Sequence, residues 1–305
     1  MNPFEEWHLD TRQIGRRVRV YKRLESTNTQ AALLADDPSN HGLVIMAEEQ
    51  TSGRGQQGRS WQAPAGKAVL MSVVVFPPPP LRRPALLTAW AAVSVCESIR
   101  QATGFQAKIK WPNDVLIRGR KVCGILIESK VQASRSEGKT KAGDNRGNSE
   151  ESSESSLFSL LPPVRPFLSS ETSEAMSGTA DFAVVAGIGL NVNQTAKDFQ
   201  EADLPQAGSL ALAAGRTFDC PTIARLLVDH LDEEYDRLAQ HDLDSLLTCW
   251  KWHIGLLGKQ VAIECPDGRH WGRLRDLTLD GVELELTGGR SLRLPPESIR
   301  HLEPA

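Results

Sequence analysis

The 305-residue chain lacks the cysteine patterns that mark two common classes of protein. Its five cysteines are scattered and include no Cys-x-x-Cys pair (Cys96, Cys123, Cys220, Cys249 and Cys265). The sequence therefore predicts neither a zinc site nor a disulfide framework. Reduced thiols in a cytosolic protein are the simpler interpretation. The seven histidines show no metal-ligand spacing either.

The chain also lacks an excess of positive charge. It has 35 Lys and Arg residues and 38 Asp and Glu residues, which gives a net charge of −3. This balance argues against a general nucleic-acid binder. No uninterrupted apolar run approaches the ~18 residues of a membrane span. The first ten residues, MNPFEEWHLD, lack the basic-then-apolar pattern of a secretory signal. We therefore expect a cytoplasmic protein that does not enter a membrane.

Hydrophobic residues make up 40% of the chain, which is enough for a sizeable core. Apolar alternation predicts strands and 3.6-residue spacing predicts helices, with Gly104 ending the second helix. The Trp90 and Cys96 stripe of that helix is interpreted as core. Strands are expected over 17–27, 42–50, 67–76 and 181–193, and a strand–turn–strand over 107–129. Helices are expected over 26–37, 84–103, 221–240 and 243–253. Ser26 or Thr27 is expected to cap the first helix.

Composition divides the chain into unequal parts. Residues 1–17 carry little pattern and are interpreted as an N-terminal extension. Residues 18–256 form the expected main domain, interrupted at 131–178 by a polar Ser, Glu, Gly and Lys-rich segment that predicts a disordered insertion. Residues 257–305 contain short alternating runs separated by PDG, LDG and TGG turns, which predict a small antiparallel β-barrel.

The segment QTSGRGQQGRSW, residues 50–61, places glycines and arginines between two expected strands. Glycine lets a backbone approach a ligand closely. The planar arginine fork suits carboxylate and phosphate. The segment is short, single and flanked by strands, so an RG-rich RNA-binding tail is disfavoured. It predicts a loop that closes over an anionic small molecule.

Two further segments carry polar residues in strand context. KWPNDVLIRGRKVCGI, residues 110–125, brings Lys110, Asp114 and Lys121 into an expected hairpin. GIGLNVN, residues 187–193, has glycines that would admit a ligand against the strand and an asparagine, Asn191, that can donate and accept. Simpler structural roles stay open for Lys110 as a solvated edge charge and for Trp111–Pro112 as turn-shaping residues.

In their order and spacing, STN, Q-x-x-GRG-x-x-GR-x-W, KWPND with RKVCGIL, GIGLNVN and the C-terminal small domain resemble biotin protein ligases. The resemblance covers about 18–130 and 180–305. It implies an α+β fold with a mixed, mostly antiparallel sheet, helices and an SH3-like barrel. Residues 1–25 leave no room for a winged helix module before the STN motif, so the short, monofunctional type without a DNA-binding domain is expected.

The resemblance also implies roles for the residues that match the family pattern. Lys121 and Arg54 are the expected catalytic cations. The expected biotin-binding residues are Ser26, Thr27, Asn28, Gln50, Arg54, Lys121 and Gly124. The expected ATP- or adenylate-binding residues are Gly53, Gly55, Arg59, Trp61, Asp114 and Asn191. Asp114 is in addition the candidate contact for Mg²⁺.

The implied reaction joins two anions, the biotin carboxylate and the α-phosphate of ATP, so cations must neutralise their repulsion. The product would be biotinyl-5′-adenylate, whose acyl group then passes to a lysine of a biotin carboxyl carrier domain. An ordered lid would protect this water-sensitive anhydride, and we expect the loop to be open when empty. The resemblance implies no specific DNA binding, and it leaves a homodimer and a monomer open.

One departure lies inside the loop, where Gln56 and Gln57 stand at positions that often hold cations in relatives. A missing guanidinium predicts weaker retention of the adenylate, unless Arg59 compensates. Two alternative functions stay open from the residues: a lipoate or octanoyl transfer enzyme of the same fold, and a non-catalytic biotin-binding module. The C-terminal barrel, KWPND and Gln50 favour biotin, and the intact Lys121 and Arg54 favour catalysis.

Overall fold

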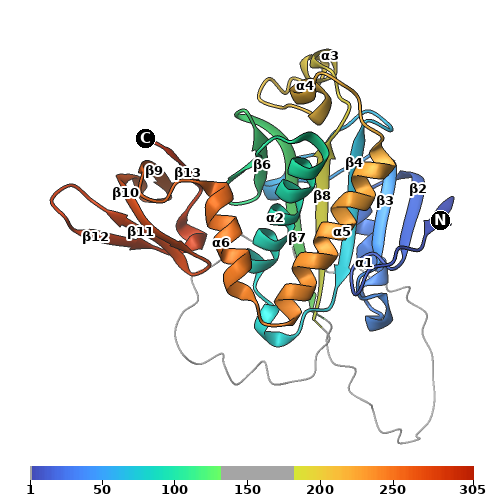
Figure 1. Cartoon of the computed structure of the whole chain (residues 1–305), viewed down its shortest axis with the longest axis horizontal. Coiled ribbons are helices and arrows are strands. Elements are labelled where there is room, and N and C mark those ends of the chain that lie inside the picture. Colours follow the sequence, from blue (N-terminus) through green and yellow to red (C-terminus); the bar gives the residue numbers. More distant parts are fainter. Residues whose placement is uncertain (1, 132–181) are drawn as a thin grey trace, which may run out of the picture.

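A twisted eight-stranded sheet forms the centre of the protein (Figure 1). The computed structural model describes residues 2–131 and 182–305. The strand order is β1-β2-β3-β4-β8-β7-β6-β5. The strands span Glu5–Trp7 (β1), Val18–Leu24 (β2), Val44–Gln50 (β3), Ala68–Val75 (β4), Lys108–Lys110 (β5), Asp114–Ile117 (β6), Arg120–Val131 (β7) and Phe182–Asn191 (β8). Among the strands that the structure describes, β2 and β3 are the one parallel pair in this sheet, which confirms a mixed, mostly antiparallel sheet.

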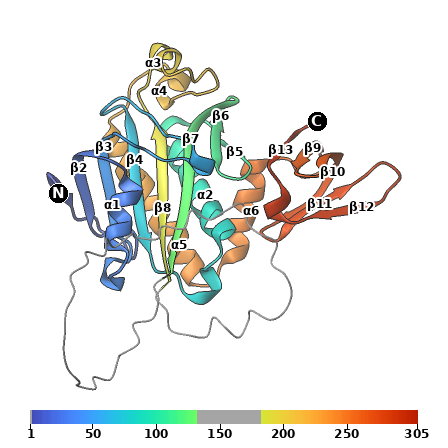
Figure 2. The same ribbon diagram turned by 180° about the vertical axis from the view of Figure 1, so that it is seen from behind.

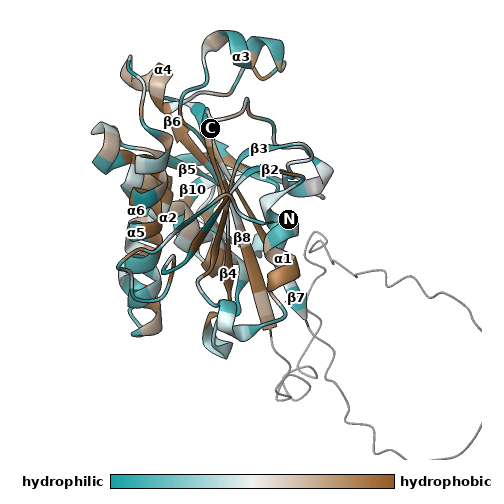
Figure 3. Ribbon diagram, turned by 90° about the vertical axis from the view of Figure 1, so that its right-hand side faces the viewer, coloured by the Kyte–Doolittle hydropathy of each residue, from teal (hydrophilic) through white to brown (hydrophobic). Residues whose placement is uncertain are grey.

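Helices cover both faces of this sheet, and the short helices that follow β8 lie beyond one of its ends (Figure 1). The helices span Thr27–Leu34 (α1), Pro84–Thr103 (α2), Ala196–Glu201 (α3), Leu210–Ala214 (α4), Cys220–Ala239 (α5) and Leu243–Ile254 (α6). Figure 3 shows α2, α5 and α6 on one face and α1 on the other. The predicted helix 84–103 is confirmed: it starts at Pro84 and ends before Gly104, whose φ of 75° is the left-handed conformation that glycine favours.

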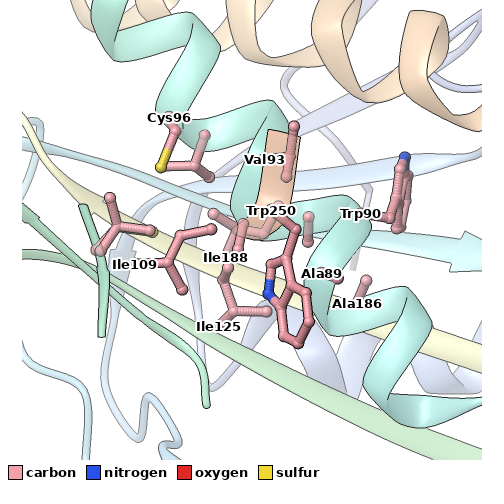
Figure 4. Close-up of a cluster of buried hydrophobic side chains, with 14 of the residues drawn as sticks. Ala89, Trp90, Val93, Cys96, Ile109, Ile125, Ala186, Ile188 and Trp250 are labelled. Carbon is pink, nitrogen blue, oxygen red and sulfur yellow. The ribbon is translucent and has the colours of Figure 1, made fainter. Parts of the chain in front are cut away.

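The main core lies between the sheet and the layer formed by α2, α5 and α6 (Figure 4). Trp90 and Cys96 of α2 are both fully buried there, so their interpretation as core residues is confirmed. The Trp90 indole also donates a hydrogen bond to the carbonyl of Leu231 on α5 at 2.9 Å. Truncating such a buried tryptophan to alanine costs about 3–5 kcal/mol, so this contact fixes α2 and α5 behind the sheet.

Residues near the N-terminus join the sheet, which their sequence did not indicate. Glu5–Trp7 forms edge strand β1, antiparallel to β2. The strand has three residues, two of them glutamates, so it shows too little alternation to be predicted. Farther along, the backbone N–H groups of Gln13 and Ile14 donate to the Asp232 carboxylate of α5 at 2.6 and 2.7 Å. These bonds tie the segment to the helical layer.

The expected insertion, 131–178, lies outside the described residues except for Val131, the last residue of β7. The structure therefore leaves that prediction, and the proposed domain boundaries, as they stood. It does show two short helices, α3 and α4, that the sequence did not indicate. They follow β8 and are too short to display helical periodicity.

The C-terminal residues form a second, five-stranded sheet beside α6 (Figure 2). Its strands are Gln260–Cys265 (β9), Gly268–Thr278 (β10), Gly281–Glu285 (β11), Ser291–Leu294 (β12) and His301–Pro304 (β13). All pairings are antiparallel, as expected of a small SH3-like barrel. Lys251 of α6 reaches Asp276 of β10 at 2.8 Å and links the two parts. No helix among the described residues has the length and apolarity to cross a bilayer.

Candidate active site

A cavity of about 50 Å³ lies on the α1 face of the main sheet, where β3, β7 and β8 meet the loop of residues 51–61. Three sequence segments that the motifs singled out, near residues 26, 54 and 121, converge on it. The predicted site residues that line it are Ser26, Thr27, Asn28, Gln50, Arg54, Gly55, Trp61, Lys121 and Gly124. Gly53, Arg59, Asp114 and Asn191 are not part of the lining.

The N-terminus of α1 forms one wall of this cavity. Ser26 is the N-cap residue in extended conformation, but neither it nor Thr27 caps the helix through its side chain, so that prediction is wrong. Gln50 of β3 takes the role instead: its Oε1 accepts from the Thr27 backbone N–H at 2.7 Å and from Thr27 Oγ1 at 3.0 Å. A carboxamide from a neighbouring strand thus satisfies a first-turn donor, and Ser26 lines the cavity without capping the helix through its side chain.

Backbone hydrogen bonds join the two arms of the loop of residues 51–61 to each other. Trp61 N–H donates to the Gly53 carbonyl at 2.9 Å, and Gly55 N–H donates to the Arg59 carbonyl at 2.7 Å. A short 3₁₀ turn, Gln56–Gly58, lies at the tip. A Cβ on Gly53 would lie 2.4 Å from the Trp61 carbonyl oxygen, so only glycine fits there. The close approach of the two loop arms therefore explains the first glycine of GRG.

The indole ring of Trp61 lies against Gly124 of β7 and Gly189 of β8. A Cβ on Gly189 would be 2.4 Å from Trp61 Cε2, and one on Gly124 would be 2.9 Å from Cζ3. Because glycine has no Cβ, these two positions let the Trp61 ring pack against the strands. The sequence predicts that a ligand packs against the glycines of β8. Lys121 Nζ lies 5.8 Å from the Trp61 ring centroid. Trp61 therefore fills space beside the cavity, directly next to the candidate catalytic lysine.

Lys121 reaches the cavity from the β6–β7 hairpin. Its Nζ pairs with Asp114 Oδ1 at 2.6 Å, and the two side chains are 36% and 25% exposed. Its backbone is fixed on the other side, because Lys121 N–H donates to the Gln206 carbonyl at 2.9 Å and its own carbonyl accepts from Gly208 N–H at 2.8 Å. Asp114 therefore contacts a cavity-lining residue, Lys121, although it does not line the cavity itself.

Three polar residues that the sequence did not single out lie in or next to the cavity wall. Glu128 of β7 is 3% exposed and accepts hydrogen bonds from Asn28 and Arg54. Ser72 of β4 is fully buried and lies 2.5 Å from Asn28 Oδ1. Asn113 lines the cavity and donates to the Ile125 carbonyl at 2.7 Å. A single carboxylate or hydroxyl inside an apolar strand is the signal that could have found Glu128 and Ser72.

Asn191, the expected adenine-contacting residue, is buried and uses both ends of its carboxamide within the protein. Its Nδ2 donates to the Gly208 carbonyl at 3.0 Å, and its Oδ1 accepts from Gln194 Nε2 at 2.7 Å. These bonds fix the segment after β8 next to the Lys121 backbone. The nucleotide contact of Asn191 stays a prediction, as does that of Arg59.

Neither a thiol nucleophile nor a dedicated metal cage is built at the cavity by the described residues. Cys123 lies beside Lys121, but burial raises the pKa of its thiol far above the usual range and keeps it protonated. The one group of three described side chains positioned to ligate a metal is Cys265, Asp267 and His270, in the small C-terminal sheet. Mg²⁺ commonly binds through one carboxylate plus substrate phosphates, and the contact expected between Asp114 and Mg²⁺ stays a prediction.

Comparisons with known proteins indicate the family to which the chain belongs. Residues 20–139 match the model of the Biotin/lipoate A/B protein ligase family. The chain is 35% identical to the biotin--[acetyl-CoA-carboxylase] ligase of Mycobacterium tuberculosis, across 98% of this chain and 96% of that protein. It is 28% identical to the bifunctional ligase/repressor BirA of Bacillus subtilis, across 90% of this chain and 71% of that protein.

The fold is that of solved relatives. The structure of the biotin protein ligase from Aquifex aeolicus in complex with biotin and ATP superposes with a TM-score of 0.65 at 19% identity, covering 94% of this chain and 99% of that one. The architecture and the family model define the class, the biotin and lipoate ligases. The near full-length similarity to the mycobacterial enzyme places the chain within it: the protein belongs to the biotin protein ligase family.

Proposed function

We propose that the protein is an ATP-dependent biotin protein ligase. It activates biotin to biotinyl-5′-AMP with release of pyrophosphate and then transfers the biotinyl group to a lysine of a biotin carboxyl carrier protein. The observation that carries this proposal is the meeting of two cations, Arg54 and Lys121, with the polar wall of α1 at one cavity. The 35% identity to a named biotin--[acetyl-CoA-carboxylase] ligase over nearly the whole chain supports the same activity.

The polar wall is suited to the ureido ring of biotin. A ureido group offers two N–H donors and one carbonyl acceptor, and hydroxyl and carboxamide side chains can complement both. Ser26, Thr27 and Gln50 supply such groups, with Asn28 behind them and Gly124 offering its backbone. The fixed Gln50–Thr27 pair holds this wall in place before a ligand arrives, which lowers the ordering cost of binding.

Activation requires the biotin carboxylate oxygen to attack the α-phosphorus of ATP while the bond to the β-phosphate oxygen breaks. Lys121 and Arg54 are assigned to offset the repulsion of the two anions and the charge that develops on the α-phosphate. Mg²⁺ arriving with ATP would supply further charge neutralisation, and Asp114 is the residue assigned to hold it. Gly53, Gly55, Arg59, Trp61 and Asn191 are assigned to the nucleotide side of the site.

In the second step the neutral amine of the acceptor lysine attacks the anhydride carbonyl, AMP leaves, and the amine loses a proton. The acceptor is proposed to be the carrier domain of a carboxylase, because the name of the mycobacterial relative contains acetyl-CoA-carboxylase. A cytoplasmic location, the lack of specific DNA binding and the choice between monomer and homodimer stay predictions from the sequence.

The test is a biotinylation assay with protein, MgATP, biotin and a carboxyl carrier domain, with lipoate run in parallel and Lys121→Ala as the control. Biotin-dependent pyrophosphate release and a labelled carrier, both lost in the control, would support the proposal. Labelling with lipoate in place of biotin would identify the alternative transfer enzyme. Biotin binding without pyrophosphate release would identify a non-catalytic biotin-binding module and overturn the proposal.

A further inference from the structure

The carboxylate of Glu128 joins two parts of the cavity wall. Its Oε2 accepts from Asn28 Nδ2 at 2.7 Å and from Arg54 Nη2 at 2.9 Å. Asn28 belongs to α1, Arg54 to the loop of residues 51–61, and Glu128 to β7. One buried oxygen therefore ties together three segments that lie far apart in the sequence.

The contacts continue from Asn28 to the other end of the wall. Ser72 Oγ lies 2.5 Å from Asn28 Oδ1 and 2.8 Å from Thr27 Oγ1, so its single proton serves one of these acceptors at a time. Thr27 Oγ1 in turn donates to Gln50 Oε1. A continuous row of polar side chains thus connects Gln50, at the proposed ring-binding end, with Arg54, at the proposed anion-binding end.

Glu128 acts on Arg54 and not on a ligand, since it does not line the cavity. The guanidinium is a rigid planar fork, so fixing Nη2 also sets the direction of its remaining donors. Arg54 Nε is buried with no hydrogen-bond partner among the described residues, which leaves the Glu128 contact to hold the fork. Arg54 is 31% exposed and Glu128 is 3% exposed, so the pair is only partly screened by water.

We infer that Glu128 is a positioning residue that orients Arg54 and anchors the loop of residues 51–61 to β7. The catalytic part of this inference rests on the proposed function. It predicts that Arg54 contributes to biotin activation only while the Glu128 carboxylate is present. Residues that act as one unit give strongly non-additive losses when both are replaced.

The kinetic test is a double-mutant cycle on biotin-dependent pyrophosphate release. Arg54→Ala is expected to lower kcat/KM about 10²–10³-fold, as when a preorganised charge-stabilising donor is removed. Glu128→Ala is expected to lower it about 10²-fold, because a misplacement of about 1 Å costs that much. Adding Arg54→Ala to Glu128→Ala is expected to change the rate less than about threefold. Fully additive losses, or a wild-type rate for Glu128→Ala, would overturn the inference.

Two further variants control for unfolding of the alanine variant and for the loss of a charge elsewhere on β7. Glu128→Gln keeps an acceptor for both bonds without the charge, and it replaces Glu128→Ala in the cycle if circular dichroism shows that the alanine variant is unfolded. Glu128→Gln is expected to lower kcat/KM less than Glu128→Ala does. Its loss should again be non-additive with that of Arg54→Ala, in the same direction. Lys130→Gln removes a charge two residues along β7, where Lys130 pairs with Asp36 at 2.7 Å, and is expected to leave the rate at wild type.

A second readout needs neither biotin nor ATP. Tryptic cleavage after Arg59, followed by mass spectrometry relative to sites in α5, is expected to accelerate in both Glu128 variants but not in Lys130→Gln. Unchanged cleavage would overturn the anchoring role even in an active enzyme. Faster cleavage in the Glu128 variants, combined with a wild-type protein that releases no pyrophosphate in response to biotin, would instead support the anchor and overturn the proposed function.

Discussion

Lys121→Gln should separate catalysis from stability. The Lys121–Asp114 pair has an N–O distance of 2.6 Å, but the lysine side chain is 36% exposed, so water screens it. Such pairs contribute about 0–1 kcal/mol to folding. For a protein of this size the loss corresponds to a fall in Tm of at most about 4 °C. The backbone bonds of Lys121 to Gln206 and Gly208 do not depend on its side chain and remain.

The same substitution should lower biotin-dependent pyrophosphate release about 10²–10³-fold, which is about 2.7–4 kcal/mol of transition-state stabilisation. The assay is steady-state pyrophosphate release with thermal unfolding measured on the same samples. Lys110→Gln is the matched control: Lys110 is an exposed cation that ends β5 of the same sheet, and both measurements should stay at wild type. A Lys121→Gln rate within about threefold of wild type, or a Tm loss above about 10 °C, would refute the reasoning.

Gln56 lines the cavity without a charge, so Gln56→Arg should slow dissociation of the adenylate, measured by filter binding of the pre-formed intermediate; an unchanged rate would contradict this. Gly189→Ala should push the indole of Trp61 away from β8, because the new Cβ would lie 2.4 Å from Cε2, and lower biotin activation about 10²-fold in the same pyrophosphate assay. Hydrogen bonds from Lys67 hold the pKa of Asp198 at about 2, below its usual 3.8. Because that pKa is lowered, its contribution to stability is present above pH about 4 and lost as pH falls through about 2. The Tm difference between wild type and Lys67→Met should therefore vanish over that range, and a pH-independent difference would contradict this.

Local sequence signals located most elements that build the site. The helical spacing over 84–103 and the stop at Gly104 gave the bounds of α2 to the residue, and the apolar runs on either side of QTSGRGQQGRSW became β3 and β4. The motifs around residues 26, 54 and 121 also met at one cavity, as their resemblance to biotin ligases implied. Short-range features can be predicted in this way because caps, turns and strand alternation depend on neighbouring residues.

Predictions failed where a side chain finds its partner across the fold. The helix cap expected from Ser26 or Thr27 comes instead from Gln50, because the β2–α1–β3 crossover brings the end of β3 to the start of α1. Asn191 is also engaged within the protein, by Gly208 and Gln194, but its predicted nucleotide contact stays a prediction. Nothing local distinguishes a carboxamide that meets a ligand from one that closes a loop.

The sequence by itself determined the family, the order of the longer strands and helices, the glycine positions and the two cations, because these depend on residue type and spacing. Only the tertiary structure decided which side chains hold those cations and the loop. Glu128 meets Arg54 across 74 residues and Asn28 across 100 residues, and Trp61 meets Gly124 and Gly189 on two separate strands. Such contacts arise from sheet order and close packing, which a linear pattern does not encode.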